Sequence, residues 1–514
     1  MATGLETGPE TGLNPGRGTG QETRRETGPN PERGTGRAAA TGRLFIDGRW
    51  SPAVRGGLRE IVDPTSGEPI TSVAEADAED VARATLAART AFDDGRWSGL
   101  PPRRRAEVLT RAAELMREHA EELARLESLD VGKPLAAYRA VDVPTAIDVV
   151  GYYAALAATI DGAARSTAIP TLAYTRREPI GVVAAITPMN FPLVLGVSKL
   201  APALVAGNTV VHKPAEETPL TSLRMARLFQ EAGLPDGVLN VVTGDGETGA
   251  DLVWSGHVDK IAFAGSTAVG RSVAAAAGEM IKHVTVELGG KGANIIFADA
   301  DLEAAIGTAI AGFVFNTGQF CMSGSRLLVE RPVYDTVVAA MHRAVAELRV
   351  GDPFDEETVI GPMAGPRHLA KVRSYLQRAR QAPVEVVSGP EPGGRGFFVP
   401  PTVITGAGQD SPWVQEEIFG PVLTVQPFDS EEEAVALANG TPYGLAAGLQ
   451  TRDVARAHRI AAGLRAGIVW INGWALLDPA VPLGGTRASG FGRTNGPEGL
   501  AEYLQTKSVV LNLG

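Results

Sequence analysis

The sequence contains a single cysteine and no arrangement of histidines that would hold a metal. Because Cys321 is the only cysteine in 514 residues, no intrachain disulfide can form, and a reducing compartment such as the cytoplasm suits the chain. The seven histidines never fall at H-x-x-x-H or Cys/His spacings typical of metal sites. We therefore expect no structural or catalytic metal. The motif G-x-S-x-G is also missing, which argues against serine-hydrolase chemistry.

The sequence also has no excess of positive charge. The formal net charge is -11 and the pI is about 5.3, whereas a nucleic acid or an anionic membrane surface would call for a basic face. We therefore expect a small-molecule partner, and neither nucleic acid nor a membrane. The length and a hydrophobic share of 44% are compatible with two or three domains that have a large buried core.

One uncharged stretch, residues 180–197, is just long enough to raise the question of a membrane span. Pro188, Asn190 and Pro192 lie in its middle, where a lipid-exposed helix could not satisfy its backbone. The pattern favours a buried strand that runs into a helix.

Residues 1–42 have almost no apolar side chains and consist mainly of Gly, Thr, Glu, Arg, Pro and Asn. They contain an imperfect repeat, ETGLNPGRGTG at 10–20 and ETGPNPERGTG at 26–36. Such a segment cannot offset the entropy of folding, so we expect a disordered extension. It matches neither a secretory signal nor a mitochondrial presequence.

Short apolar runs alternate with helical patterns from Arg43 onward. The candidate strands are residues 182–186, 209–212, 239–242, 260–263, 283–288 and 294–297, with helices between them at 220–232 and 268–280. This alternation predicts an α/β fold with a mainly parallel sheet, because parallel strands need crossover connections. After Cys321 a second alternating stretch, extended at 326–329 and 384–387 and helical at 333–348, predicts a second α/β domain.

Two glycine motifs fit between a strand and a helix. GDGETG at 244–249 matches the G-x-G-x-x-G dinucleotide fingerprint, and GSTAVG at 265–270 has small residues that would let helix N-terminal amides face a pyrophosphate. Either motif alone is equally compatible with a tight turn.

Seven segments, in order, resemble the aldehyde dehydrogenase superfamily from about Arg43 to the C-terminus. They are ITPMNFP at 186–192, HKPAE at 212–216, FAGST at 263–267, VELGGK at 286–291, NTGQFCMSGSR at 316–326, EEIFGP at 416–421 and PLGG at 482–485. The resemblance implies NAD(P)-dependent oxidation of an aldehyde to a carboxylic acid.

The resemblance also implies roles for three catalytic residues. Cys321 would attack the aldehyde carbon, because its thiolate is nucleophilic. Asn190 and the backbone N–H of Cys321 would hold the developing oxyanion, and Glu287 would activate water to hydrolyse the thioester. The CoA-acylating branch generally lacks this glutamate, so release of the free acid is favoured over acyl transfer to CoA. A catalytically silent protein of the same fold is the remaining alternative.

For the cofactor, the resemblance places Lys213 and Glu216 at the adenosine ribose. A carboxylate there favours NAD, because it accepts from the 2′-OH and repels a 2′-phosphate, while NADP stays possible. Other residues that match cofactor-binding positions are Ile186, Gly246, Gly265, Ser266, Val269, Leu288, Glu417 and Phe419.

The chain departs from the family at several positions. Met189 replaces a tryptophan, and Thr494 replaces a glutamate that relays protons in relatives together with a lysine at the position of Lys199. In the substrate tunnel Phe191 keeps an aromatic wall, but Ser198, Leu477 and Leu483 stand where relatives have aromatics. The departures in the tunnel predict a wide, apolar passage for a bulky hydrophobic or aromatic aldehyde.

The family fold implies a Rossmann-like cofactor domain over residues 43–159 and 178–288 and a catalytic domain over 289–485. A small β oligomerisation element would combine residues 160–177 with 498–514, where the extended segment 508–513 could pair with a neighbouring subunit. The resemblance therefore implies a homodimer or homotetramer.

Overall fold

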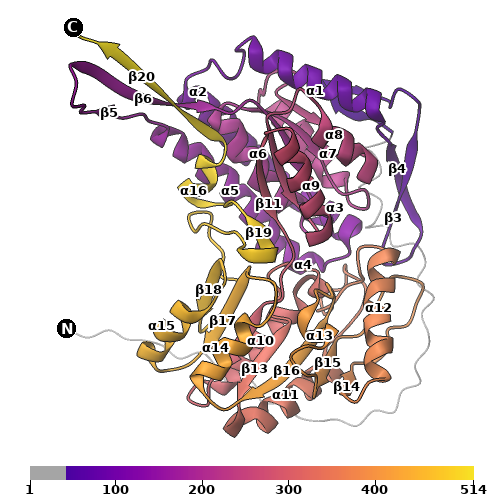
Figure 1. Ribbon diagram of the computed structural model, residues 1–514. Helices are drawn as coiled ribbons and strands as arrows, with labels where there is room; N and C mark the ends of the chain where they lie inside the picture. Colours follow the sequence, from indigo (N-terminus) through magenta and orange to yellow (C-terminus); the bar gives the residue numbers. More distant parts are fainter. Residues whose placement is uncertain (1–41) are drawn as a thin grey trace, which may run out of the picture. The chain divides into compact units, whose positions relative to one another are not determined.

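The computed structural model describes residues 42–514, which contain two large β-sheets, one three-stranded sheet and one β-hairpin (Figure 1). The predicted disorder of residues 1–42 lies, apart from Gly42, outside the described residues. The hairpin joins β3 (Leu58–Val62) to β4 (Pro69–Ala74).

The first large sheet has eight strands, and its five central strands are parallel. In spatial order the strands are β19 (Gly490–Phe491), β11 (His283–Glu287), β10 (Lys260–Ala264), β7 (Val182–Ile186), β8 (Thr209–Lys213), β9 (Leu239–Val241), β1 (Leu44–Ile46) and β2 (Arg49–Ser51). The five strands predicted in this region are confirmed to within one residue at each end.

Helices cover both faces of this sheet, because its strands carry apolar side chains on both sides. Along β7, Val183 and Ala185 join one core while Val182, Ala184 and Ile186 join the other, as the alternation of side chains along a strand requires. One core includes α2 (Pro102–Glu118), α3 (Ala120–Val131), α5 (Val143–Leu156), α6 (Pro192–Ala206) and α7 (Leu220–Glu231), and the other includes α1 (Ala78–Asp93), α8 (Gly246–Trp254) and α9 (Thr267–Glu279).

The uncharged stretch 180–197 forms β7 and the start of α6, which confirms the predicted buried strand and helix. A different segment, Leu135–Thr159, is long and apolar enough to cross a membrane by length and composition, but half of its most apolar window is buried inside the protein. Its main helix, α5, packs against α2 and α6. These contacts are those of a core helix.

The second large sheet confirms the predicted second α/β region. Its seven strands are, in order, β14 (Glu385–Ser388), β15 (Thr402–Thr405), β16 (Val422–Phe428), β13 (Arg326–Glu330), β12 (Ala293–Ile296), β17 (Ala446–Gln450) and β18 (Ile468–Ile471). All neighbours are parallel except β14 and β15. The helices of this region include α10 (Leu302–Val314), α11 (Tyr334–Glu347), α12 (Pro366–Arg380), α13 (Pro412–Gln415), α14 (Glu431–Asn439) and α15 (Val454–Gly463).

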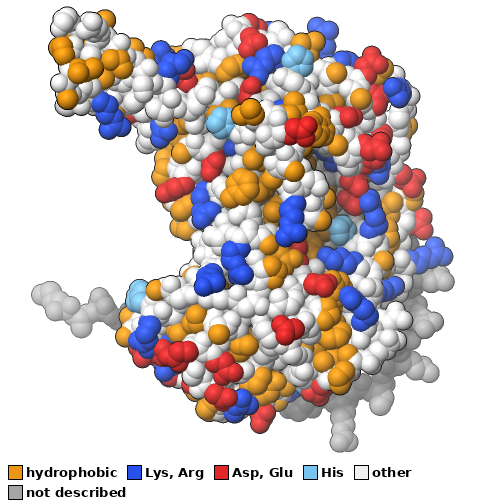
Figure 2. Space-filling model, in the orientation of Figure 1, with side chains coloured by type: hydrophobic (Ala, Val, Ile, Leu, Met, Phe, Trp, Pro, Cys, Tyr) orange, Lys and Arg blue, Asp and Glu red, His pale blue; other side chains and the backbone are white. Residues whose placement is uncertain are grey.

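The C-terminal strand β20 (Leu504–Asn512) follows the short helix α16 (Gly496–Ala501) and pairs antiparallel with β6 (Thr171–Pro179). The short strand β5 (Ala164–Arg165) lies on the other side of β6, so the outer edge of β20 pairs with no other strand of residues 42–514. Apolar side chains are exposed on this three-stranded arm (Figure 2), among them Ile169, Leu172, Tyr174, Val510, Leu511 and Leu513.

A fully buried ion pair lies below the start of α6. Lys133 Nζ is 2.5 Å from Asp142 Oδ1, and both side chains are at most 1% exposed. The ammonium also lies 4.0 Å from the ring centroid of Phe191 and 4.9 Å from that of Phe315. Asp142 ends a short π-helical turn, Tyr138–Asp142, so an irregular helix supplies the carboxylate that this lysine needs.

We expect Lys133→Met to destabilise the protein by about 3–5 kcal/mol, because it leaves the Asp142 carboxylate buried without its cation. The free energy of unfolding in urea, taken from the first transition seen by tryptophan fluorescence, measures the effect. The matched control is Lys133→Met/Asp142→Leu, which removes both charges and should recover most of the loss. If the single and double variants lose the same free energy of unfolding, the ion pair does not act mainly by compensating buried charge.

Candidate active site

The carboxyl ends of the central parallel strands bring the predicted residues to one edge of the first sheet. Ala264 is in register with Glu287, and Ile186 is in register with both Phe263 and Lys213. Ligands of open parallel sheets bind outside this edge. The order of the strands therefore lines up, from β11 to β8, a carboxylate, a glycine-rich turn and a lysine.

Cys321 follows a strained turn at the end of α10. Asn316, Thr317 and Gly318 all have left-handed φ values, of 51°, 57° and 68°, which is unusual for a β-branched residue such as Thr317. Gly318 is required there, since a Cβ would lie 2.2 Å from the backbone of Gly420. Thr317 Oγ1 donates to the Gly361 carbonyl at 3.0 Å, so tertiary contacts hold the turn.

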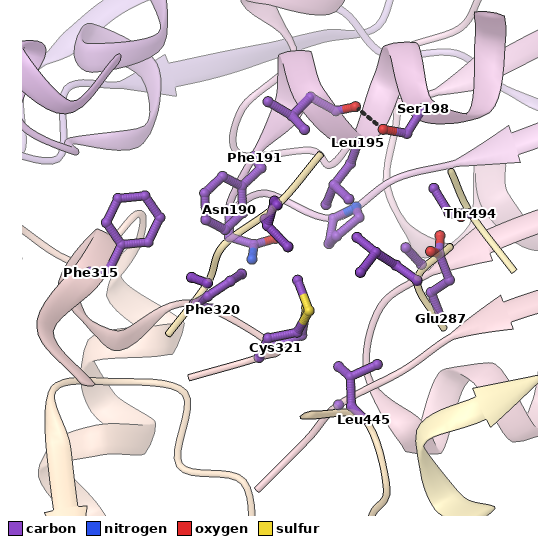
Figure 3. Close-up of a pocket in the computed structure, with 18 of the residues that line it drawn as sticks. Asn190, Phe191, Leu195, Ser198, Glu287, Phe315, Phe320, Cys321, Leu445 and Thr494 are labelled. Atoms are coloured by element: carbon purple, nitrogen blue, oxygen red, sulfur yellow. Dashed lines mark hydrogen bonds between the residues drawn. The ribbon is translucent and has the colours of Figure 1, made fainter. Parts of the chain in front are cut away.

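Reciprocal hydrogen bonds join this turn to the segment before α6. Asn316 Nδ2 donates to the Asn190 carbonyl at 2.7 Å, and Asn190 Nδ2 donates to the Gln319 carbonyl at 2.8 Å. Asn190 is only 2% exposed. Its amide nitrogen carries a second N–H, and its side chain faces the same cavity as the Cys321 thiol (Figure 3).

Glu287 ends β11 and forms an ion pair through Oε2 with the ammonium of Lys199, which is 2% exposed. Thr494 lies beside Glu287 in the cavity wall (Figure 3) and is fixed by two backbone hydrogen bonds of 2.7 Å with Leu483. The lysine therefore reaches Glu287 directly, although position 494 carries no carboxylate.

One cavity of about 450 Å³ joins the catalytic and substrate residues with part of the cofactor set. Of the residues predicted from the sequence, it is lined by Asn190, Phe191, Ser198, Gly265, Ser266, Glu287, Leu288, Cys321, Glu417, Phe419, Leu477 and Leu483. Five others lie outside its lining, namely Ile186, Lys213, Glu216, Gly246 and Val269. Val269 is about half exposed on α9.

The cavity wall near Cys321 is aromatic and apolar. Phe191, Phe315 and Phe320 form a cluster with ring centroids 5.4–5.9 Å apart. The Ser198 hydroxyl donates to the Val194 carbonyl at 2.7 Å, so its hydrogen bond is satisfied within α6. Trp474 lies behind the nucleophile, where its indole N–H donates to the Met322 carbonyl at 3.0 Å.

The sequence analysis missed many lining residues, among them two aromatic and two basic side chains. Phe315 and Trp474 extend the aromatic wall, and His368 and Lys371 add two basic side chains from α12. The position of Phe315 directly before the Cys321 motif was a signal for it. No motif marked the other three, because they come from segments distant in sequence from the nucleophile.

The residues at the sheet edge fit a dinucleotide. Ser266 caps α9, where its hydroxyl accepts from Val269 N at 3.3 Å, and a helix N-terminus of this kind suits a pyrophosphate. Gly270 lets α9 approach the sheet, since a Cβ there would lie 2.1 Å from Leu288. Glu417 Oε1 accepts from Gly290 N at 2.9 Å, which leaves the other oxygen for a hydroxyl.

The other glycine motif, residues 244–249, packs beside the predicted ribose site. Asp245 caps α8, and a Cβ on Gly249 would lie 3.5 Å from Lys213 Cδ. The Lys213 ammonium is buried and donates to the Pro214 carbonyl at 2.9 Å, and burial lowers its pKa. Within residues 42–514, no group of three or more His, Cys, Asp or Glu side chains could hold a metal ion.

The thiol lies in a negative environment. Burial and, to a smaller extent, the carboxylates of Glu417 and Glu287 raise the pKa of Cys321 to about 12, against the backbone N–H groups of Met322 and Cys321. Without ligand the thiol is therefore protonated at neutral pH.

We expect alkylation of Cys321 by iodoacetamide to accelerate about tenfold per pH unit from pH 7 to 10, because the thiolate fraction grows until pH reaches the pKa. Mass spectrometry of the intact protein measures the rate at this single thiol. Glu417→Gln removes one carboxylate and should raise the rate at fixed pH, whereas the adjacent Glu416→Gln should not. A plateau in the rate near pH 8 would contradict the raised pKa.

The chain matches known proteins over most of its length. Residues 50–509 match the model of the aldehyde dehydrogenase family. The betaine aldehyde dehydrogenase of Bacillus subtilis is 44% identical over 480 residues, which cover 91% of this chain and 97% of the relative.

Solved structures agree with this match. An NAD+ complex of an aldehyde dehydrogenase from Bacillus cereus superposes with a TM-score of 0.92 at 42% identity, covering 95% of this chain and 99% of the other. The betaine aldehyde dehydrogenase of Staphylococcus aureus, also with NAD+, has a TM-score of 0.92 at 38% identity, covering 94% and 97%. These matches confirm the resemblance and the α/β fold class, and the chain belongs to the aldehyde dehydrogenase family.

Proposed function

We propose that this protein oxidises an aldehyde to a carboxylic acid, with NAD as the hydride acceptor and a thioester on Cys321 as the intermediate. The observation that carries the proposal is the single cavity that joins Cys321, Asn190 and Glu287 to the glycine-rich cofactor edge of the first sheet. The neighbours crystallised with NAD+ support the cofactor.

We infer one step for each of these residues. The thiol of Cys321 gives up its proton to water and attacks the aldehyde carbon as the thiolate. The oxyanion of the thiohemiacetal accepts hydrogen bonds from the free N–H of Asn190 Nδ2 and the backbone N–H of Cys321. When bound, NAD would supply the hydride acceptor for oxidation of this adduct to the thioester. Glu287 then takes a proton from water, which attacks the thioester and releases the acid. An ion pair with the Lys199 ammonium holds the Glu287 carboxylate at the cavity wall.

The remaining cofactor contacts follow the sheet edge. Lys213 and Glu216 would meet the adenosine ribose, and Glu417 and Phe419 the nicotinamide ribose and ring. Ile186, Gly246, Gly265, Ser266, Val269 and Leu288 would complete the surface against the cofactor.

We further propose a bulky hydrophobic or aromatic aldehyde as the substrate. Leu477, Leu483 and the internally bonded Ser198 add no aromatic face to the cavity, while the Phe191 cluster provides an apolar wall near the nucleophile. Betaine aldehyde is the competing substrate, since two of the relatives carry that name. Its quaternary ammonium would need an aromatic cage, for which Phe191, Phe315, Phe320 and Trp474 are the available rings.

The free edge of β20 and its exposed apolar side chains support a homodimer or homotetramer in which this strand pairs with another subunit. The domain division at residues 288/289, the oligomerisation element of residues 160–177 and 498–514 and a cytoplasmic location remain part of the proposal.

Glu287→Gln should form the thioester but hydrolyse it at least about 100-fold more slowly, because a neutral amide cannot take the proton of water. The expected result is one equivalent of NADH per active site and an acyl adduct on Cys321, seen in the intact mass. Cys321→Ala is the control and should give neither NADH nor adduct. NADH turnover that requires CoA in the unaltered enzyme would favour the acyl-transfer alternative.

The substrate proposal predicts a higher kcat/KM for hexanal and benzaldehyde than for acetaldehyde or betaine aldehyde, by about tenfold or more, because only the larger apolar groups bury surface in the cavity. An NADH-release panel at fixed pH measures these values. Ser198→Trp narrows the passage and should reduce the value for benzaldehyde more than that for acetaldehyde. A preference of the unaltered enzyme for betaine aldehyde would overturn the substrate class and leave the reaction unaffected.

A further inference from the structure

A salt bridge spans the predicted ribose site. Glu216 lies between β8 and α7 of the first-sheet region, whereas Arg367 stands in the first turn of α12, a helix of the second-sheet region. Arg367 Nη2 is 2.6 Å from Glu216 Oε1 and 3.4 Å from Glu217 Oε1. The carboxylate expected to meet the ribose 2′-OH therefore has a guanidinium beside it. The next residue, His368, already lines the cavity.

More charges of both signs surround this pair. Arg59 binds Glu75 and lies 3.7 Å from Asp245 Oδ2, the cap of α8. The pKa of Arg59 is raised by its hydrogen bond to Glu75 and by further carboxylates that include Glu216. The region is thus a mixed array of cations and anions, in which Glu216 is one member and already paired.

Such an array bears on cofactor choice, because NAD and NADP differ only in the 2′-phosphate of the adenosine ribose. A lone carboxylate at this place accepts from the 2′-OH and repels the phosphate, while a nearby arginine accommodates the phosphate. Both groups are present here.

We propose that Arg367 is a cofactor-specificity residue that exchanges Glu216 for the 2′-phosphate, so that the enzyme binds NADP as well as NAD. This inference rests on the proposed function, which places Glu216 at the adenosine ribose. With NAD, Arg367 stays on Glu216 and the carboxylate accepts from the 2′-OH. With NADP, the guanidinium binds the phosphate and offsets its charge.

The exchange is physically accessible. The Arg367 side chain is 72% exposed and that of Glu216 is 19% exposed. The guanidinium is therefore well solvated and can leave the carboxylate at a small cost. The planar guanidinium has five N–H donors and can hold a phosphate through two of them at once. After the exchange, Glu216 still has Lys213 as a nearby cation, which acts on the same group of carboxylates.

Two adenosine fragments test the inference on the enzyme without aldehyde. Isothermal titration calorimetry gives the Kd of 5′-AMP, which has the 2′-OH, and of 2′,5′-ADP, which has the 2′-phosphate. We expect both to bind the unaltered enzyme with Kd values within about tenfold of each other. Arg367→Ala should weaken 2′,5′-ADP by at least about tenfold and change the Kd of 5′-AMP by less than about twofold, because only the phosphate loses its charged partner.

Two further variants sharpen the result. Glu216→Gln removes the repelling charge and should tighten 2′,5′-ADP relative to 5′-AMP. Arg378→Ala is the matched control, since Arg378 lies on the same helix but stacks on Tyr375 at 4.3 Å, and it should leave both Kd values unchanged. The ratio of the two Kd values does not depend on the amount of folded protein.

The outcomes separate the inference from the proposed function. The role of Arg367 is overturned if 5′-AMP binds and 2′,5′-ADP does not. It is also overturned if Arg367→Ala weakens the binding of both fragments equally. Both outcomes leave NAD-dependent oxidation intact. If 5′-AMP neither binds nor competes with NAD+, the placement of the cofactor site fails and the inference fails with it.

Discussion

The reciprocal hydrogen bonds between Asn190 and the turn before Cys321 are the contact on which the site depends. Asn190 belongs to the segment between β7 and α6, and Cys321 to the segment between α10 and β13, so the proposed oxyanion donor and the proposed nucleophile lie next to different sheets. The bonds from Asn316 to the Asn190 carbonyl and from Asn190 to the Gln319 carbonyl fix them together. The backbone of this turn is strained at Thr317, and its conformation directs the Cys321 thiol toward the Asn190 amide.

Two buried lysines contact residues of the cavity wall. Lys133 supports the aromatic wall through Phe191 and Phe315, and Lys199 pairs with Glu287. Burial and, to a smaller extent, the carboxylates of Glu417 and Glu287 raise the pKa of the Cys321 thiol, whereas Glu287 forms an ion pair with an ammonium.

The sequence predicts the elements of this fold well where local pattern decides them. The five central strands of the first sheet are mainly apolar runs bounded by turns, so their predicted limits are confirmed to within one residue. Nothing local shows that residues 490–491 pair with β11 beside Glu287, because that pairing joins segments 200 residues apart. The same holds for the site. Motifs indicated Cys321, Glu287 and Asn190, whereas Trp474, His368 and Lys371 enter the cavity only through tertiary packing.

Cofactor preference illustrates the same limit in a single interaction. A motif on β8 identifies Glu216, and a carboxylate taken alone argues for NAD. The side chain that modifies this argument, Arg367, is 151 residues away and reaches Glu216 from a helix of the other sheet. Since the 2′-phosphate would respond to the summed charge of both groups, the specificity of this site belongs to the pair. A prediction from Glu216 alone therefore considers only the part of the site that the local sequence encodes.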